Sequence, residues 1–172
     1  KDFAAEQYKA FLQCATKIIH RRDGHIRSFD GDRVMGVFIG DRKCTNAVRA
    51  GLLIHGAVKT IIMPTLKRQY PATKYQMRHV VGIDISPVLA IKAGIRNSND
   101  IAWIGRAANH AAKLAAKSPL SPTWISDKIY HRIAKSEKYG WENGEKVNMW
   151  KKHEWGAQNN RRIYSSTWYR HP

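Results

Sequence analysis

Residues 27–38, which read RSFDGDRVMGVF, decide how the N-terminal half of the chain folds. Their centre, Asp30-Gly31-Asp32, is a tight-turn signal between two short apolar runs, so we predict a β-hairpin with strands at about 25–29 and 34–39. A carboxylate at a glycine-containing turn is well placed to bind a hard cation such as Mg²⁺ or Mn²⁺. An Asp-Gly pair is also typical of a turn without any ligand, and the pattern alone leaves both interpretations open.

Helices are predicted on both sides of this hairpin. Residues 2–22 and 45–69 carry apolar side chains at intervals of three and four, which is the spacing of an amphipathic helix. Pro64 is expected to bend or end the second of them.

A third helix is predicted further along the chain, at residues 105–117. Its alanines mark a buried face, and the opposite face carries Arg106, Asn109, His110, Lys113 and Lys117. Asn109 and Lys113 lie one turn apart, so an amide and an ammonium group could together hold a ribose oxygen and a phosphate. A solvated basic face would show the same spacing.

The remaining pattern alternates between strands and short helices. Together these segments predict one α+β domain over residues 1–172, with helices packed on a sheet. The further predicted elements are strands at 75–86, 101–103 and 123–126, a helix at 127–134 capped by Asp127, and strands at 146–155 and 161–170 joined by a turn at 156–160.

The composition is strongly basic. The chain has 172 residues with 30 Lys and Arg against 13 Asp and Glu, and its formal net charge is +17. Such a charge suits a nucleic acid, a nucleoside triphosphate, an anionic membrane or simple solvation. Apolar runs such as 34–39 are too short to cross a bilayer, and Cys14 and Cys44 have no metal-ligand spacing, so we expect a reduced, cytoplasmic protein.

Aromatic residues are interleaved with the basic residues in the C-terminal part. Such side chains either stack on nucleic-acid bases or fill a sheet edge or a subunit interface, and we favour the second interpretation. The residues concerned are Trp141, Trp150, Trp155, Trp168 and Tyr169.

Taken in order, these segments resemble a class III nucleotidyl cyclase domain. The resemblance rests on residues 27–38, on Val81-Gly82-Ile83 and on 103–114, WIGRAANHAAKL, and it covers about residues 3–134. It implies a class III cyclase-like sandwich in which helices flank a central, mostly antiparallel sheet. Residues 135–172 are then expected to be a family-specific C-terminal extension, and the family's first strand is expected upstream of Lys1.

The resemblance also implies roles for single residues. Asp32 would bind divalent metal, two Mn²⁺ or Mg²⁺ ions, with a second metal-binding aspartate expected upstream of residue 1. Asn109 would orient the ribose. Lys113 stands where the family usually has a phosphate-binding arginine, so it keeps the charge but loses the bidentate fork. The positions implied to bind substrate are Ser28 and Ala102 for the base, and Arg106 on the face where the triphosphate would lie.

Ser28 and Ala102 match neither the adenine-reading nor the guanine-reading pair of the family. In this respect the chain most resembles the bacterial Pycsar antiphage cyclases, which make cyclic UMP or cyclic CMP. The resemblance implies a cytoplasmic enzyme that uses UTP in preference to CTP, for signalling in antiphage defence. It also implies a head-to-tail homodimer in which Asp32 of one chain faces Asn109 and Lys113 of the other, with no membrane partner.

A catalytically inactive cyclase-like domain, or a basic module that binds nucleic acid, is the alternative. It predicts binding to a generic duplex or single strand that weakens steeply with salt. A cyclase should instead bind one triphosphate in a metal-dependent way.

Overall fold

The structure, a computed structural model, describes the backbone of residues 2–93 and 100–172, and the side chains of residues 3–91, 105–156 and 158–172. The predicted first helix and hairpin are confirmed. Helix α1 (Asp2–Arg21) leads into strands β1 (Gly24–Asp30) and β2 (Arg33–Phe38), which pair in antiparallel fashion. Gly31 occupies the turn with φ of 56°, a left-handed conformation that glycine adopts without strain.

The second predicted helix is continuous. It runs as α2 (Lys43–Ala57), a π-helical turn η1 (Val58–Ile62) and α3 (Met63–Gln69). Pro64 does not end the helix, because the wider π turn directly precedes it and Pro64 falls in the first turn of α3, where a missing N–H costs little. The helix Lys43–Gln69 is long and apolar enough to span a membrane, but 61% of its apolar window is buried inside the protein, where it forms much of the core.

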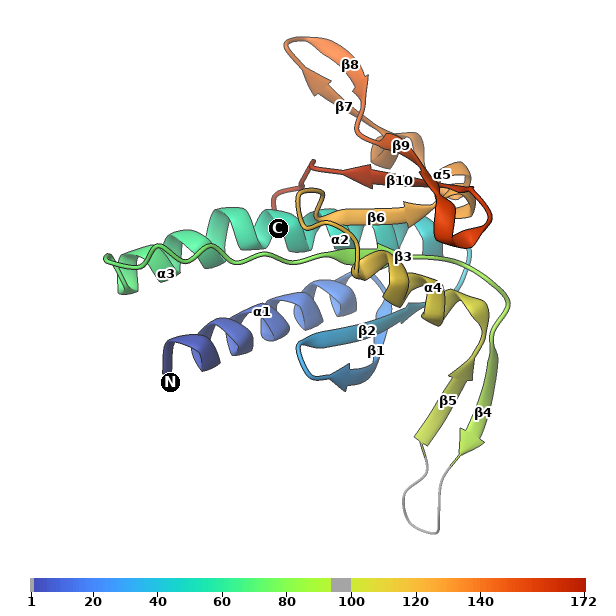
Figure 1. Cartoon of the computed structure of the whole chain (residues 1–172), viewed down its shortest axis with the longest axis horizontal. Coiled ribbons are helices and arrows are strands. Elements are labelled where there is room, and N and C mark those ends of the chain that lie inside the picture. The colour runs from blue at the N-terminus through green and yellow to red at the C-terminus, as the bar shows by residue number, and fades with distance from the viewer. Residues whose placement is uncertain (1, 94–99) are drawn as a thin grey trace.

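The central sheet has the order β3-β6-β10-β9, shown in Figure 1. Strands β3 and β6 are parallel, whereas β10 pairs antiparallel with both β6 and β9, so the α+β fold with a mostly antiparallel sheet is confirmed. Strand β10 lies in the middle of the sheet although it comes last in the sequence. The strands are β3 (Val81–Ile83), β6 (Thr123–Ser126), β9 (Lys151–Trp155) and β10 (Arg161–Ser166).

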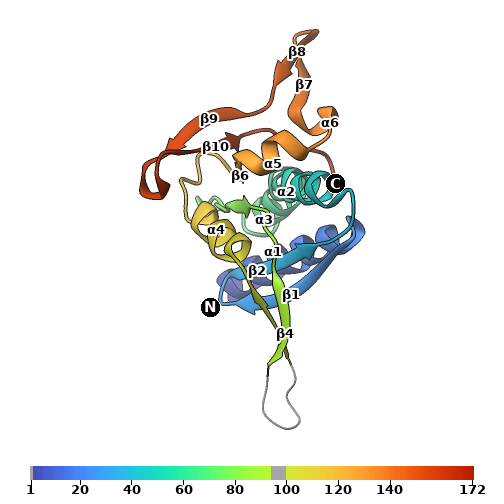
Figure 2. The ribbon, with the colours of Figure 1, turned by 90° about the vertical axis from the view of Figure 1, so that its right-hand side faces the viewer.

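Helices cover both faces of this sheet, because side chains alternate along its strands. Ile83 and Ile125 pack with Val48 and Leu52 of α2 on one face. Trp124 packs on the other face with Leu114 of α4 (Arg106–Ala115), which lies in front of the sheet in Figure 1 and on the far side from α2 in Figure 2.

The predicted strand at 75–86 was wrong for most of its length. Only Val81–Ile83 pairs, and residues 74–80 run extended without a partner strand in the part of the chain that the structure describes. The first bond of the pairing is Val81 N–H to Pro122 O, 2.7 Å, and the loop before Pro122 contains Pro119. Because that loop leaves β6 only four residues long, the earlier part of the segment has no strand to pair with.

Two hairpins project from this body. The first joins β4 (Leu89–Ala93) to β5 (Asp100–Ile104), which contains the predicted strand at 101–103. The second joins β7 (Tyr139–Glu142) to β8 (Glu145–Asn148) and was not predicted. Its signal was the pair Asn143-Gly144, whose φ angles of 52° and 82° are those of a tight hairpin turn.

The predicted strand at 146–155 is split by the buried residues Met149 and Trp150. A short helix α6 (Lys135–Lys138), also not predicted, precedes the β7–β8 hairpin. Helix α5 (Asp127–Arg132) was predicted with Asp127 as its cap, but Asp127 is the first helical residue. Its Oδ1 accepts a hydrogen bond from the Tyr164 hydroxyl at 3.4 Å instead.

Candidate active site

The backbones of strand β3 and helix α4 are in direct contact at Gly82. A Cβ added at Gly82 would lie 2.1 Å from the carbonyl oxygen of Ala111 and 2.5 Å from the amide nitrogen of Ala115. Only glycine allows this approach, so Gly82 of the predicted Val81-Gly82-Ile83 motif brings α4 directly onto the sheet.

The segment that follows β3 holds the start of α4. The flanking residue Gly105 has no side chain to cap the helix, and the hydroxyl of Ser86 accepts a hydrogen bond from the Ala107 amide at 3.0 Å. Arg106 Nη2 donates to the carbonyl oxygen of Ile85 at 3.1 Å. The bond to Ser86 satisfies one of the backbone N–H groups at the helix N-terminus that would otherwise lack a partner, and the bond from Arg106 ties the first residue of α4 to the segment after β3.

Asp84 is a buried carboxylate beside α4 that the sequence did not single out. Its side chain is 0% exposed, and its Oδ2 lies 3.5 Å from Arg106 Nη2 and 3.5 Å from His110 Nδ1. Neither carboxylate oxygen accepts a hydrogen bond from a described residue. The available signal was a carboxylate placed directly after a buried strand.

His110 was predicted on the solvated face of α4 and is buried. Burial first, and then the charge of Arg106, lower the pKa of His110, so its ring is neutral near pH 7. Arg106 Nη1 lies 3.2 Å from His110 Nδ1 and can only donate, which places the imidazole proton on Nε2. Among the described residues, Asp84 is therefore balanced by the charge of Arg106 alone.

Asn109 and Lys113 are exposed on α4, one turn apart, as predicted. Neither forms a hydrogen bond or ion pair with any other side chain that the structure describes, so both can reach a ligand. Lys117, from the same predicted face, instead lies over the Trp155 ring with Nζ 5.1 Å from its centroid.

Asp32 lies at the exposed tip of the β1–β2 hairpin. Its neighbour Asp30 is engaged in an ion pair with Arg33, and Asp32 has no such partner within the described part of the chain. That part also holds no group of three or more His, Cys, Asp or Glu side chains able to bind a metal ion. One free carboxylate is compatible with Mg²⁺, which is often bound through one or two carboxylates and substrate phosphates.

The predicted base-reading residues lie on the β1–β2 hairpin and on the β4–β5 hairpin. Ser28 is exposed on β1 opposite Met35, and Ala102 lies in β5 opposite Ile91, although the Ala102 side chain falls outside the described residues. Within the described part of one chain, no hydrogen bond or ion pair joins Asp32 or Ser28 to α4.

Known proteins resemble the chain along almost its whole length. It is 44% identical over 166 residues to a protein named uridylate cyclase from Xanthomonas perforans, a match that covers 96% of this chain and 70% of the relative. A uridylate cyclase from Burkholderia cepacia is 45% identical, with 96% of this chain and 69% of the relative covered. No family model matches the chain.

Solved structures agree on the fold. A bacterial light-regulated adenylyl cyclase superposes with a TM-score of 0.74 at 18% identity, over 96% of this chain and 44% of that one. The adenylyl cyclase CyaB from P. aeruginosa superposes with a TM-score of 0.73 at 21% identity, over 99% and 85% of the two chains.

The chain belongs to the class III nucleotide cyclases. In this cyclase domain, the β1–β2 hairpin carries Asp32, α4 carries Asn109 and Lys113, and the central sheet packs against α4.

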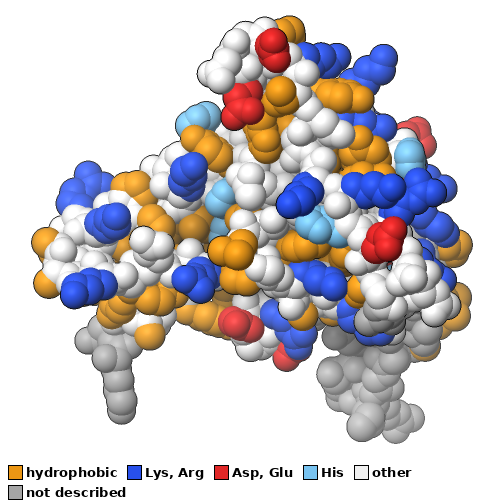
Figure 3. Space-filling model, turned by 45° about the horizontal axis from the view of Figure 1, so that its top comes forward, with side chains coloured by type: hydrophobic (Ala, Val, Ile, Leu, Met, Phe, Trp, Pro, Cys, Tyr) orange, Lys and Arg blue, Asp and Glu red, His pale blue; other side chains and the backbone are white. Residues whose placement is uncertain are grey.

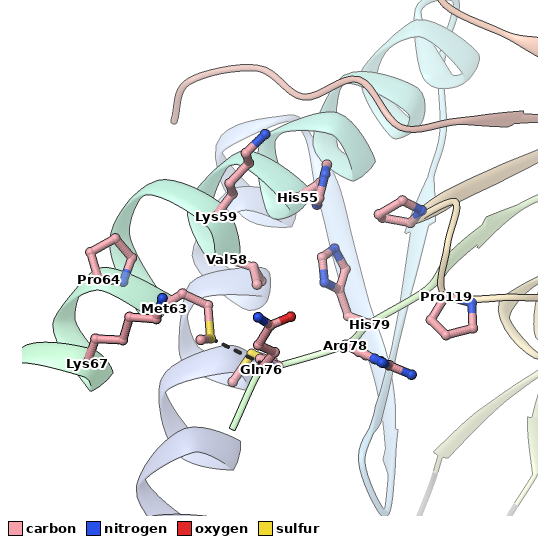
Figure 4. Close-up of a pocket in the computed structure, with 12 residues that line it drawn as sticks. His55, Val58, Lys59, Met63, Pro64, Lys67, Gln76, Arg78, His79 and Pro119 are labelled. Atoms are coloured by element: carbon pink, nitrogen blue, oxygen red, sulfur yellow. Dashed lines mark hydrogen bonds between the residues drawn. The ribbon is translucent and has the colours of Figure 1, made fainter. Parts of the chain in front are cut away.

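A cavity in the described part of this cyclase domain contains none of the predicted site residues. It has a volume of about 580 Å³ and lies between α2–α3 and the extended segment 76–79, as Figure 4 shows. Lys59, Lys67 and Arg78 line it together with His55 and His79. Burial, followed by the charge of His55, lowers the pKa of His79 to about 4.

The aromatic residues of the C-terminal part are mostly structural, as favoured from the sequence. Trp150 and Trp155 are buried, and a Cβ at Gly140 would lie 2.4 Å from the Trp168 ring. Trp141, on the β7–β8 hairpin, is 72% exposed.

Proposed function

We propose that this chain is a catalytic domain that converts UTP to 3′,5′-cyclic UMP and pyrophosphate. The observation that carries the proposal is the 44–45% identity, over 96% of the chain, to relatives named uridylate cyclase. By the resemblance of its sequence to the Pycsar antiphage cyclases, the product would serve as a cytoplasmic second messenger in antiphage defence.

The reaction is an intramolecular substitution at phosphorus. The ribose 3′-oxygen loses its proton and attacks the α-phosphorus, the bond from that phosphorus to the α–β bridging oxygen breaks, and pyrophosphate leaves with the electron pair. Little covalent chemistry falls to the protein, so positioning and charge stabilisation dominate. The Asn109 amide would hold the ribose in line, and the Lys113 ammonium would stabilise negative charge as it develops on the phosphates.

Asp32 would be one ligand of a divalent cation. Bound Mg²⁺ or Mn²⁺ would neutralise phosphate charge and lower the pKa of the 3′-hydroxyl. The exposed hairpin tip suits a carboxylate ligand, because Gly31 allows the tight turn and β1 and β2 hold both of its sides. A second metal-binding aspartate is proposed to lie upstream of residue 1.

The site would be shared between two copies of the chain. Asp32 of one protomer would face Asn109 and Lys113 of its partner in a head-to-tail homodimer. The exposure of all three side chains, with no partner for any of them in the described part of one chain, supports this arrangement.

Pyrimidine selection would depend on Ser28, Ala102 and Arg106. The Ser28 hydroxyl can donate to a carbonyl of uracil, and the Ala102 side chain has no donor or acceptor with which to make the hydrogen bonds of purine-reading side chains. The Arg106 side chain is 32% exposed and donates hydrogen bonds to His110 Nδ1 and to the Ile85 carbonyl oxygen. Its remaining donors can reach substrate.

Product analysis tests the proposal. Each of the four nucleoside triphosphates is incubated separately with the protein and Mn²⁺, in a form that includes its native upstream residues, and the products are identified by mass spectrometry. We expect cyclic UMP from UTP, and a loss of about 100-fold or more for Asp32→Ala. Asp41→Ala, an exposed carboxylate outside the hairpin, is the matched control and should retain activity.

Two results would overturn parts of this proposal. Faster formation of cyclic CMP from CTP would make the enzyme a cytidylate cyclase. Unchanged product formation by Asp32→Ala would show that Asp32 is not a ligand of the catalytic metal ion.

A second candidate function is binding of a polyanion without catalysis. Lys and Arg gather on the right-hand side of the face in Figure 3. The β9–β10 hairpin exposes Lys151, Lys152, Arg161 and Arg162. This function predicts no cyclic product from any triphosphate, and affinity for RNA or DNA that falls steeply between 50 and 200 mM salt, roughly as counterion release requires.

A further inference from the structure

Asp84 and His110 are buried and have no role in the reaction as proposed. Both lie beside Arg106, whose side chain is 32% exposed and is proposed above to bind substrate. Asp84 comes from the end of β3, and the other two residues lie one turn apart on α4. All three therefore join the sheet to the helix that carries Asn109 and Lys113.

The geometry of this group is that of a rotational lock. Residues 106 and 110 share one stripe of α4 and residues 109 and 113 share the neighbouring stripe, about 60° away around the helix axis. When Asp84 and the Ile85 carbonyl hold Arg106, and Arg106 holds His110, α4 cannot turn about its axis without breaking these contacts. The direction of Asn109 and Lys113 is set at the same time.

The free-energy cost of burying the Asp84 carboxylate indicates that this group does more than stabilise the fold. Asp84 is fully buried, accepts no hydrogen bond from a described residue, and has its counter-charge 3.5 Å away. Burying a carboxylate in this way is generally no better for stability than an apolar residue, whereas a buried ion pair does impose one particular arrangement. The close contact at Gly82 packs α4 against β3, and the charged group adds a defined orientation.

We propose that Asp84 is a positioning residue of the cyclase, which acts through Arg106 and His110 to orient Asn109 and Lys113 toward the ribose and phosphates. This inference rests on the proposed function of those two residues. A misdirection of about 1 Å at a reacting group is enough to lower a rate about 100-fold.

The decisive experiment compares Asp84→Asn with Glu137→Gln. Glu137 is an equally buried carboxylate, with Arg49 Nε at 2.9 Å and Arg170 Nε at 3.7 Å, but it ties α2 to α6 and the C-terminal segment rather than to α4. Both substitutions remove one buried charge while keeping shape. We expect Asp84→Asn to lower kcat by about 10- to 100-fold with KM within about 3-fold, and Glu137→Gln to leave kcat per folded molecule unchanged.

A double-mutant comparison tests whether Asp84 acts through Asn109. If it does, adding Asp84→Asn to Asn109→Ala should cause far less loss than it causes in the native background. His110→Gln, which keeps the carboxylate and Arg106, should lower kcat in the same direction and serves in its place if Asp84→Asn does not fold. Equal effects of Asp84→Asn and Glu137→Gln on kcat, or full additivity with Asn109→Ala, would overturn the inference.

A readout independent of turnover separates this inference from the proposed function. Hydrogen exchange of the α4 amides should quicken in Asp84→Asn, whereas Glu137→Gln should affect α6 and the C-terminal segment. If the native protein makes no cyclic nucleotide, the proposed function fails. The exchange result still tests whether Asp84 holds α4 in place. Unchanged hydrogen exchange in α4 would show that Asp84 does not hold this helix in place.

Discussion

His55 and His79 lie side by side in the wall of the large cavity, with ring centroids 5.3 Å apart (Figure 4). His55 Nδ1 and His79 Nε2 are buried, and neither has a hydrogen-bond partner among the described residues. Burial lowers the pKa of both rings, to about 4 for His79. The folded protein therefore holds His79 neutral, while the unfolded chain protonates it below about pH 6.5.

This difference predicts an acid-sensitive stability. Because the unfolded state binds more protons between pH 6.5 and pH 4, the free energy of unfolding should fall as the pH drops through that window, by about 2 kcal/mol from pH 7 to pH 5 for His79 alone. Urea unfolding at pH 7 and pH 5 measures it. His79→Gln should remove most of that part of the pH dependence.

His25→Gln, at an exposed position on β1, is the control and should leave the pH dependence unaltered. An identical loss of stability at pH 5 in the native protein and in His79→Gln would contradict the assignment.

At the scale of elements, the last hairpin of the chain supports α4. Trp155 of β9 packs with Leu114 of α4 and with Trp124 and Ile163 of the sheet. Its ring also makes an edge contact with His110 at a centroid distance of 5.5 Å. The β9–β10 hairpin therefore packs directly against the proposed catalytic helix. That residues 135–172 form a family-specific extension stays a prediction.

Replacing Trp155 by alanine should lower the free energy of unfolding by about 3–5 kcal/mol, because it empties a buried aromatic site. Trp141→Ala is the matched control, since that ring is 72% exposed and should change stability by no more than about 0.5 kcal/mol. Chemical denaturation of the two variants checks the difference. Equal losses would mean that Trp155 is not part of the core.

At the scale of the whole molecule, the hairpin that carries Asp32 is attached to the central sheet by side chains. Within the described residues β2 pairs only with β1, and β3 only with β6. Phe38 and Val81 each pack against both of the main core clusters and so join the two parts. The position of Asp32 relative to α4 therefore depends on core packing rather than on a shared hydrogen-bond ladder.

A shared active site makes a quantitative prediction for mixed subunits. Asp32→Ala and Asn109→Ala should each be inactive alone. In an equal mixture half of the dimers are heterodimers with one intact site of two, so activity should return to about a quarter of the native value. Cyclic UMP formation after subunit exchange measures it, and no recovery from exchanged dimers would place Asp32 and Asn109 in the same protomer's site.

Much of the fold was predictable because it depends on near neighbours in the chain. The Asp30-Gly31-Asp32 turn, the amphipathic helices and the β9–β10 hairpin follow from turn geometry and from apolar spacing, and the structure confirms them. The exposure of Asn109 and Lys113 also follows, since the spacing of α4 puts them on one stripe away from its buried leucine.

What the sequence by itself determined is thus the set of local elements and the motif residues that they carry. Only the tertiary structure decided which remote segments meet: that β10 lies in mid-sheet, that residues 74–80 have no partner strand among the described residues, and that His110 is buried against Asp84 and Trp155. Local backbone preferences are encoded within a few residues, whereas burial and charge pairing depend on chain segments brought together from far apart. Asp84 shows this most clearly, because its partner helix begins more than twenty residues later.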